Sequence, residues 1–252
     1  MSPVEAAGGR AAESEPARDV SARVDRLDWG RIAAELDAQG CARIEGLLSP
    51  EECAGLARLY AADDLFRSRV VMGRHGFGRG EYKYFRYPLP ERVLALRTSL
   101  YPQLAPIANR WHEAMGSEVR FPAQLAGFLQ RCHEAGQLRP TPLLLRYETD
   151  DYNCLHQDLY GEHVFPLQAT ILLSAPGRDF EGGEFVLTEQ RPRMQSRAEV
   201  VALQQGDAVI FAVRHRPVQG TRGVHRVQLR HGVSRLRSGR RLALGVLFHD
   251  AT

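Results

Sequence analysis

Short runs of strand-forming residues, separated by turns, fill the chain after Pro140. About eight short runs at this spacing predict an antiparallel sandwich or barrel, and a double-sheet jelly roll suits them well. We expect this β-rich core to span residues 140–252. The predicted strands are 142–148, 152–156, 167–174, 184–188, 199–203, 207–213, 224–230 and 240–249.

The first half of the chain is mainly helical in pattern, so we expect an α+β protein. Residues 1–25 lack apolar periodicity and predict a disordered tail. Residues 26–139 predict a helical support region with short strands at 41–44 and 82–87, and a glycine-rich loop at 73–80. The expected helices begin near Leu27 and at Ser49, and occupy 90–115, where Pro102 and Pro106 bend or break the helix, and 121–136.

Composition narrows the class of protein. The chain has 252 residues and a net charge of +3, which suits one large domain and does not by itself indicate a nucleic-acid binder. Four cysteines form no metal-like spacing, which favours reduced thiols. Since no segment has the apolar length of a membrane span or the pattern of a signal peptide, we expect a cytoplasmic protein.

The triplet His156-Gln157-Asp158 ends one of the predicted strands. In an extended chain, residues two apart point to the same face, so the His156 and Asp158 side chains can converge on one ion. Two histidines and one carboxylate form the facial ligand set of non-haem Fe(II) oxygenases, which leaves positions open for cosubstrate and O2. The triplet alone is weak, because nine histidines make a chance occurrence unremarkable.

A third ligand must come from a distant strand. We favour His231, with His225 as the second choice, because an arginine follows His231 at the start of the next predicted strand. We expect Ser238-Gly239 to form the turn and Arg240 to open the returning strand. A buried arginine requires an anion beside it, and a carboxylate of a dicarboxylate ligand can accept two parallel hydrogen bonds from its guanidinium. The alternative is that Arg240 lies on the surface; alternation allows only one of Arg240 and Arg241 to face inward.

Four motifs in this order carry a family resemblance. They are His156-Gln157-Asp158, the Gly-Gly-Glu-Phe run at 182–185, the Gly-Asp-Ala run at 206–208 and His231 followed by Arg240. Together they resemble the prolyl-4-hydroxylase type of Fe(II)/2-oxoglutarate dioxygenases, especially bacterial members. The resemblance covers about residues 140–251.

The resemblance implies a double-stranded β-helix, Fe(II), 2-oxoglutarate and O2. It implies iron ligands at His156, Asp158 and His231, and contacts to 2-oxoglutarate from Arg240, Tyr147 and Thr170. Some relatives place a tyrosine where this chain has Ser174. Because Asp158 is present, where halogenases of this superfamily have a small residue, hydroxylation is the expected reaction.

The substrate implied by the resemblance is a prolyl group, or another small molecule or peptide, with release of succinate and CO2. The Arg-rich cluster typical of nucleic-acid demethylases does not follow His231, so we expect no nucleic-acid partner and no membrane partner. Two other readings remain open at this point. One is a cupin-like metal protein, and the other is a non-catalytic jelly roll that binds a partner.

Overall fold

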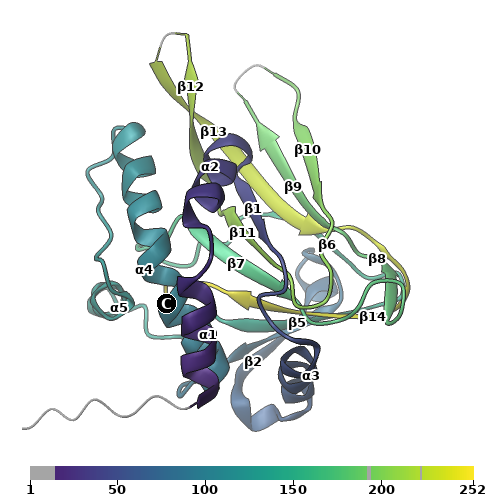
Figure 1. The fold of residues 1–252 in the computed structure, drawn as a ribbon. Coiled ribbons are helices and arrows are strands. Elements are labelled where there is room, and N and C mark those ends of the chain that lie inside the picture. Colours follow the sequence, from purple (N-terminus) through teal and green to yellow (C-terminus); the bar gives the residue numbers. More distant parts are fainter. Residues whose placement is uncertain (1–14, 192–193, 222) are drawn as a thin grey trace, which may run out of the picture.

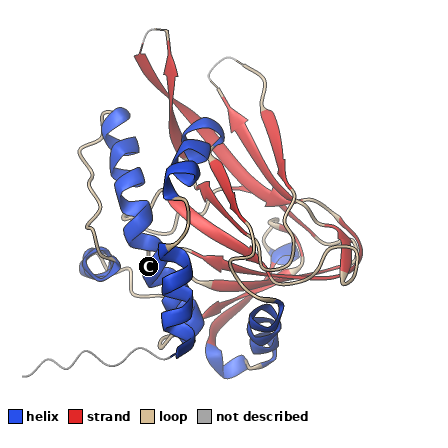
Figure 2. Cartoon of the chain, viewed as in Figure 1, coloured by secondary structure: helices blue, strands red, loops and turns tan. Residues whose placement is uncertain are grey.

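The computed structural model describes residues 15–191, 194–221 and 223–252. Figures 1 and 2 show two facing β-sheets with most of the helices gathered along one side. The α-helices are α1 (Glu15–Asp25), α2 (Trp29–Gln39), α3 (Pro50–Arg58), α4 (Glu91–Ala114) and α5 (Leu125–Glu134), and the 3-10 helices are η1 (Leu59–Ala61), η2 (Asp63–Leu65) and η3 (Met72–Arg74).

In the second half of the chain, eight of the ten strands overlap the predicted positions, while the strands at 180–182 and 215–220 were not predicted. Those of the first half are β1 (Cys41–Ile44), β2 (Phe66–Val71), β3 (Gly78–Arg79) and β4 (Glu81–Phe85). Those of the second half are β5 (Leu143–Glu148), β6 (Tyr152–His156), β7 (Leu167–Leu172), β8 (Phe180–Gly182), β9 (Phe185–Gln190), β10 (Arg197–Val201), β11 (Ala208–Ala212), β12 (His215–Gly220), β13 (Gly223–Val233) and β14 (Leu236–Val246).

The strands form two antiparallel sheets. The major sheet has the order β1-β11-β7-β14-β5-β4-β2, with β8 paired to β14. The minor sheet has the order β10-β9-β13-β6-β3, with β12 paired to β13. The helical half of the chain thus supplies β1, β2 and β4 to the major sheet and β3 to the minor sheet, so the predicted core at 140–252 is completed by earlier residues.

Buried aromatic residues join the major sheet to the helices outside it. Tyr101 of α4 contacts Phe128 of α5, Phe165 and Phe248, with ring centroids 4.9 to 6.0 Å apart. Phe121 closes the cluster against Phe165 at 5.0 Å. Because such rings bury large apolar areas, this cluster fixes α4 and α5 against the end of β14.

Two sequence predictions in the helical half were wrong. Residues 15–25, predicted as part of a disordered tail, form α1, whose Val20 and Val24 are buried; residues 1–14 lie outside the described part. Helix α4 also runs unbroken through Pro102 and Pro106. The prolines lie on its half-buried and exposed side, and we infer that the buried stripe opposite offsets the hydrogen bonds they remove.

The capping box at the start of α3 was predicted correctly. The Ser49 hydroxyl accepts a hydrogen bond from the Glu52 amide, while the Glu52 carboxylate accepts one from the Ser49 amide. Among the described residues, no helix is long and apolar enough to cross a membrane.

His249, beyond the end of β14, is buried, and desolvation lowers its pKa to about 4. An unfolded histidine titrates near 6.5, so unfolding takes up a proton between these two pH values and stability falls as pH falls. Between pH 7 and pH 5 the free energy of unfolding should fall in both proteins. We expect the fall to be about 2 kcal/mol smaller in the His249→Gln variant than in the wild type. Urea unfolding of both proteins at the two pH values measures this difference, and parallel losses would contradict it.

Candidate active site

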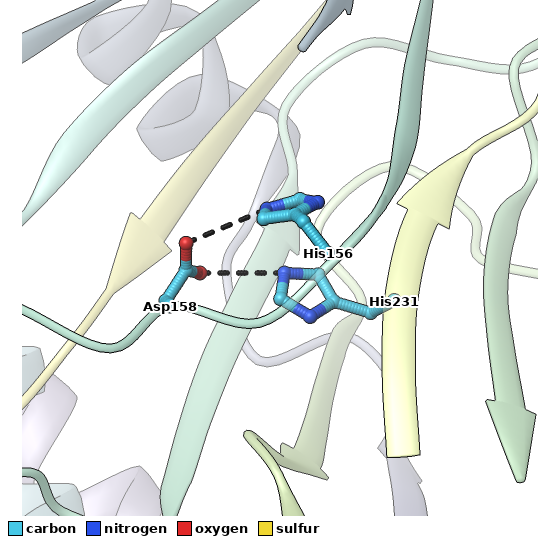
Figure 3. Close-up of side chains that lie close together, drawn as sticks. All are labelled: His156, Asp158 and His231. Atoms are coloured by element: carbon cyan, nitrogen blue, oxygen red, sulfur yellow. Dashed lines mark ion pairs between the residues drawn. The ribbon is translucent and has the colours of Figure 1, made fainter. Parts of the chain in front are cut away.

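Three side chains predicted as metal ligands converge between the two sheets. One nitrogen each of His156 and His231 and one oxygen of Asp158 all lie within 4.8 Å of one another. Asp158 Oδ1 lies 3.4 Å from His156 Nε2, and Asp158 Oδ2 lies 3.3 Å from His231 Nε2, as Figure 3 shows. The donor set is that of a facial Fe(II) site.

The strand register brings the two histidines together. His156 at the end of β6 pairs directly with His231 of β13, and the ring centroids are 4.2 Å apart. The register shifts immediately afterwards, at Gly232. A Cβ on Gly232 would lie 2.6 Å from the Asn153 carbonyl oxygen, so only glycine permits β13 to approach β6 this closely.

Neighbouring residues hold the ligands in orientation. The Tyr160 hydroxyl donates to Asp158 Oδ1 and the Gln168 amide donates to Asp158 Oδ2, both at 2.9 Å. His156 Nδ1 lies 2.8 Å from the Cys154 carbonyl oxygen, so it carries the proton and leaves Nε2 free to coordinate. Such outer contacts fix the ring tautomer and the carboxylate direction.

Electrostatics favour the metal-binding protonation states of Asp158 and His231. Burial opposes protonation of His156, but its hydrogen bond to Asp158 raises its pKa. Burial opposes ionisation of Asp158, but hydrogen bonds from the two imidazoles hold its pKa well below the usual range. Burial, followed by the nearby His156, lowers the pKa of His231. An anionic carboxylate and a neutral imidazole are the forms that bind a cation.

The triad lies in a cavity of about 350 Å³ between the sheets. Residues of both sheets line it, including Tyr147 of β5 and Thr170 of β7 in the major sheet. Tyr147 is buried beside Asn153, to which its hydroxyl lies 3.4 Å away, while Thr170 is partly buried. Both residues therefore line the same cavity as the triad, and their contact with 2-oxoglutarate stays a prediction.

The inward-facing arginine is Arg241, not Arg240, so this prediction was wrong. The Arg240 side chain is 63% exposed and lies 3.5 Å from Glu148. Arg241 is 2% exposed, lines the cavity and lies over the Tyr147 ring at 5.6 Å. Arg240 and Arg241 do face opposite sides of the strand, as alternation requires.

The reason for the error lies in the turn before β14. The reversal occurs at Ser234-Arg235, so Ser238-Gly239 lies inside β14, with a register shift against β8 and a φ of 82° at Gly239. From Arg241 onward the strand alternates regularly. Its inward positions are Arg241, Ala243, Gly245 and Leu247, all of which line the cavity.

Arg241 is poised for an anion. Burial lowers the pKa of its guanidinium, and it forms no ion pair with a described residue. Its Nε is buried without a hydrogen-bond partner. A carboxylate of a ligand in the cavity would supply the missing partner, which is the role expected for the far end of 2-oxoglutarate.

Comparison with known proteins identifies the family. A family described as "Oxygenase, catalysing oxidative methylation of damaged DNA" (Oxygenase-NA) matches residues 80–251, more than half of the chain. The chain belongs to this family. The uncharacterised protein Rv2227 of Mycobacterium tuberculosis is 48% identical over 196 residues, which are 76% of this chain and 84% of that protein.

Solved structures share the fold of this Oxygenase-NA member. A prolyl-4-hydroxylase from Pseudomonas putida is 15% identical with a TM-score of 0.53, and the match covers 89% of this chain and 100% of that one. A prolyl hydroxylase from Trichoplax adhaerens reaches 0.55 at 14% identity, covering 94% and 95%. The 2-oxoglutarate-dependent epimerase SnoN reaches 0.55 at 18%, covering 89% and 83%.

Family, fold and ligand set together identify the Oxygenase-NA protein as an Fe(II)- and 2-oxoglutarate-dependent dioxygenase. The predicted superfamily, fold class and cofactors are thereby confirmed. The family description names damaged DNA, which runs against the expectation of no nucleic-acid partner.

Sequence reasoning missed the residues that support Asp158. Tyr160 follows the triplet by two positions, on the same side of the chain, and this spacing could have suggested it. Gln168 gives no sequence signal, because its contact depends on how β7 lies relative to β6.

The Tyr160→Phe substitution is expected to weaken Fe(II) binding roughly tenfold, at the low end of the 10–100-fold effects typical of outer contacts. It removes one hydrogen bond from Asp158 and leaves the ring in place. The rate of succinate release, measured as Fe(II) is titrated into the protein, gives the Fe(II) affinity of each variant. Tyr87→Phe, which removes a hydroxyl bonded to Asp250 instead, is the control, and equal Fe(II) affinity in the two variants would contradict the role of Tyr160.

Proposed function

We propose that this oxygenase hydroxylates a methyl group on a base of damaged DNA, with Fe(II) held by His156, Asp158 and His231. Arg241 would hold the distal carboxylate of 2-oxoglutarate. The family description supports DNA as the substrate class. A hydroxymethyl group on a base nitrogen would leave as formaldehyde and restore the base.

One observation carries the proposal: the triad and the unpaired Arg241 guanidinium share one cavity but come from opposite sheets. A metal cation at the triad can bind the 2-oxo acid end of 2-oxoglutarate, and the positive guanidinium of Arg241 can bind the carboxylate at its other end. A cupin-like metal protein or a non-catalytic jelly roll would have no use for this arginine, because an unpaired buried charge is destabilising.

When bound, iron and 2-oxoglutarate supply the oxidising chemistry, in which O2 gives one atom to the substrate hydroxyl and one to succinate as CO2 is released. The chain's own residues bind, orient and exclude water. Tyr160 and Gln168 orient the Asp158 carboxylate. Tyr147 covers the Arg241 guanidinium, which limits its hydration.

Aromatic side chains form the substrate side of the cavity. Tyr82, Tyr84 and Tyr160 line it, and Phe77, which is 48% exposed, lies on its rim. Tyr84 meets Tyr82 and Tyr160 edge-on, at 5.3 and 6.3 Å between ring centroids. Enzymes that modify a base take it out of the stack and hold it against aromatic faces, which supports a flat substrate.

A prolyl group stays a second candidate, because the same apolar walls also suit a pyrrolidine ring. Succinate release separates the two. We expect a single-stranded oligonucleotide with N-methylated bases to raise it well above the substrate-free rate and to yield equimolar formaldehyde. The unmethylated oligonucleotide and a proline-rich peptide should not. Hydroxyproline from the peptide, with no response to methylated DNA, would overturn the proposal.

A further inference from the structure

A second cavity, of about 380 Å³, lies between the end of α4, α5 and the start of β12. It is separate from the metal cavity, and the two share no lining residue. Six basic side chains line it: His112, Arg131, His163, Arg214, His215 and Arg226. We call this set the basic pocket.

The positive charge of the basic pocket is not neutralised by the described residues around it. Arg131 and Arg226 each donate to a backbone carbonyl, of Arg120 and Met115, at 2.7 Å. Neither they nor Arg214 form an ion pair with a described residue. The one carboxylate in the described lining is Glu162, which is exposed.

The histidines of the basic pocket do not form a metal site. Within the described ranges, the group with metal-ligand spacing is the triad at residues 156, 158 and 231. His112 Nδ1 already lies 3.2 Å from the Ser117 hydroxyl. Burial and nearby arginines, among them Arg226, lower the pKa of both His112 and His215, as expected where positive charge accumulates. The pocket therefore suits an anion.

One loop separates the basic pocket from the metal cavity. It runs from Asp158 to Pro166, and it contributes residues to the lining of both cavities. Asp158 and Tyr160 line the metal cavity, whereas Leu159 and residues 161–164 line the basic pocket. An anion in the basic pocket would thus lie directly behind the segment that carries the carboxylate ligand.

We propose that the basic pocket binds a phosphate group of the DNA strand whose modified base enters the metal cavity. This inference rests on the proposed function and extends it by assigning the strand a second contact. Arg226 and His231 lie five residues apart on β13, about 17 Å along the strand. That separation is longer than one nucleotide, so it suits a phosphate further along the strand rather than part of the reacting group. Arginine forks are well matched to phosphate oxygens.

The test compares two double variants with the same change of charge. Arg214→Gln/Arg226→Gln removes two arginines of the basic pocket. Arg26→Gln/Arg58→Gln removes two exposed arginines that line neither cavity. Binding of a fluorescent single-stranded oligonucleotide is measured by anisotropy at several salt concentrations. If loss of the Arg226 bond to Met115 impairs folding, Arg214→Gln alone serves, because the Arg214 guanidinium forms no hydrogen bond or ion pair with a described residue.

We expect the pocket variant to bind about tenfold more weakly, with a slope of log affinity against log salt that is shallower by roughly 1. The control variant should stay within about twofold of the wild type. Equal affinities in the two variants would overturn the inference. So would a 5′-mononucleotide that competes as well as the oligonucleotide, because the pocket would then serve a free phosphorylated ligand.

The failure of this inference is distinguishable from failure of the proposed function. Oxidation of methylated DNA by the wild type tests the function. If the wild type oxidises the oligonucleotide and the pocket variant does so with the same KM, the pocket assignment is wrong and the function stands. We expect instead a KM about tenfold higher, with substrate-free succinate release unchanged.

Discussion

Replacing Asp158 with alanine is expected to lower succinate release at least about a thousandfold, equivalent to about 4 kcal/mol. The substitution removes the one anionic ligand of the triad and leaves two neutral imidazoles to hold a divalent cation. His156→Ala and His231→Ala should act in the same direction, because each removes a ligand from a site that has only three.

The control for the triad is His225→Ala. His225 lies on β13, the same strand as His231, but outside the cavity that contains the triad. It was also the second choice for the distal ligand, so this variant separates the two assignments. Wild-type activity in His225→Ala and loss in His231→Ala is the expected pair of results. Loss of activity in His225→Ala with wild-type activity in His231→Ala would instead assign the distal metal ligand to His225.

Arg241→Met is expected to raise the KM for 2-oxoglutarate by roughly 100-fold, while Arg240→Met changes it less than about twofold. A bidentate guanidinium–carboxylate contact supplies about 3 kcal/mol, which corresponds to that factor. Methionine keeps much of the arginine volume, so packing changes little. The two adjacent residues form a matched pair, one buried and one exposed.

Stability provides an independent readout for the same pair. Without a ligand, Arg241 is a buried charge with no ion-pair partner among the described residues, so the Met variant should be as stable as the wild type or more stable. Urea unfolding in the absence of 2-oxoglutarate measures this. A loss of several kcal/mol in Arg241→Met would mean that the arginine has a structural partner and is not held ready for a ligand.

The sequence predicted those helices and strands whose formation depends on neighbouring residues in the chain. Alternation located the β-strands of the second half except β8 and β12, and capping chemistry located α3. The triad could be proposed from the spacing of the His156 triplet and from the order of motifs that follow it. The reciprocal register of β6 and β13, which makes the two histidines direct neighbours, is set by tertiary pairing and is visible only in the structure.

The choice between Arg240 and Arg241 shows where sequence reasoning fails. A strand has period two, so an error of one residue in the start of a strand exchanges its two faces. The Ser238-Gly239 pair has the composition of a turn, yet β14 passes through it with an irregular register. Similarly, Val20 and Val24 were too few to predict α1, which depends on packing against α4.

An anaerobic titration tests the central claim most directly. Wild-type protein with Fe(II) and 2-oxoglutarate should develop the weak visible charge-transfer band of the chelate. The band should be absent in Asp158→Ala, require far more 2-oxoglutarate in Arg241→Met, and be unchanged in Arg240→Met. A wild type without the band, or an Asp158→Ala variant that keeps it at wild-type strength, would contradict the assignment of the triad as the iron site.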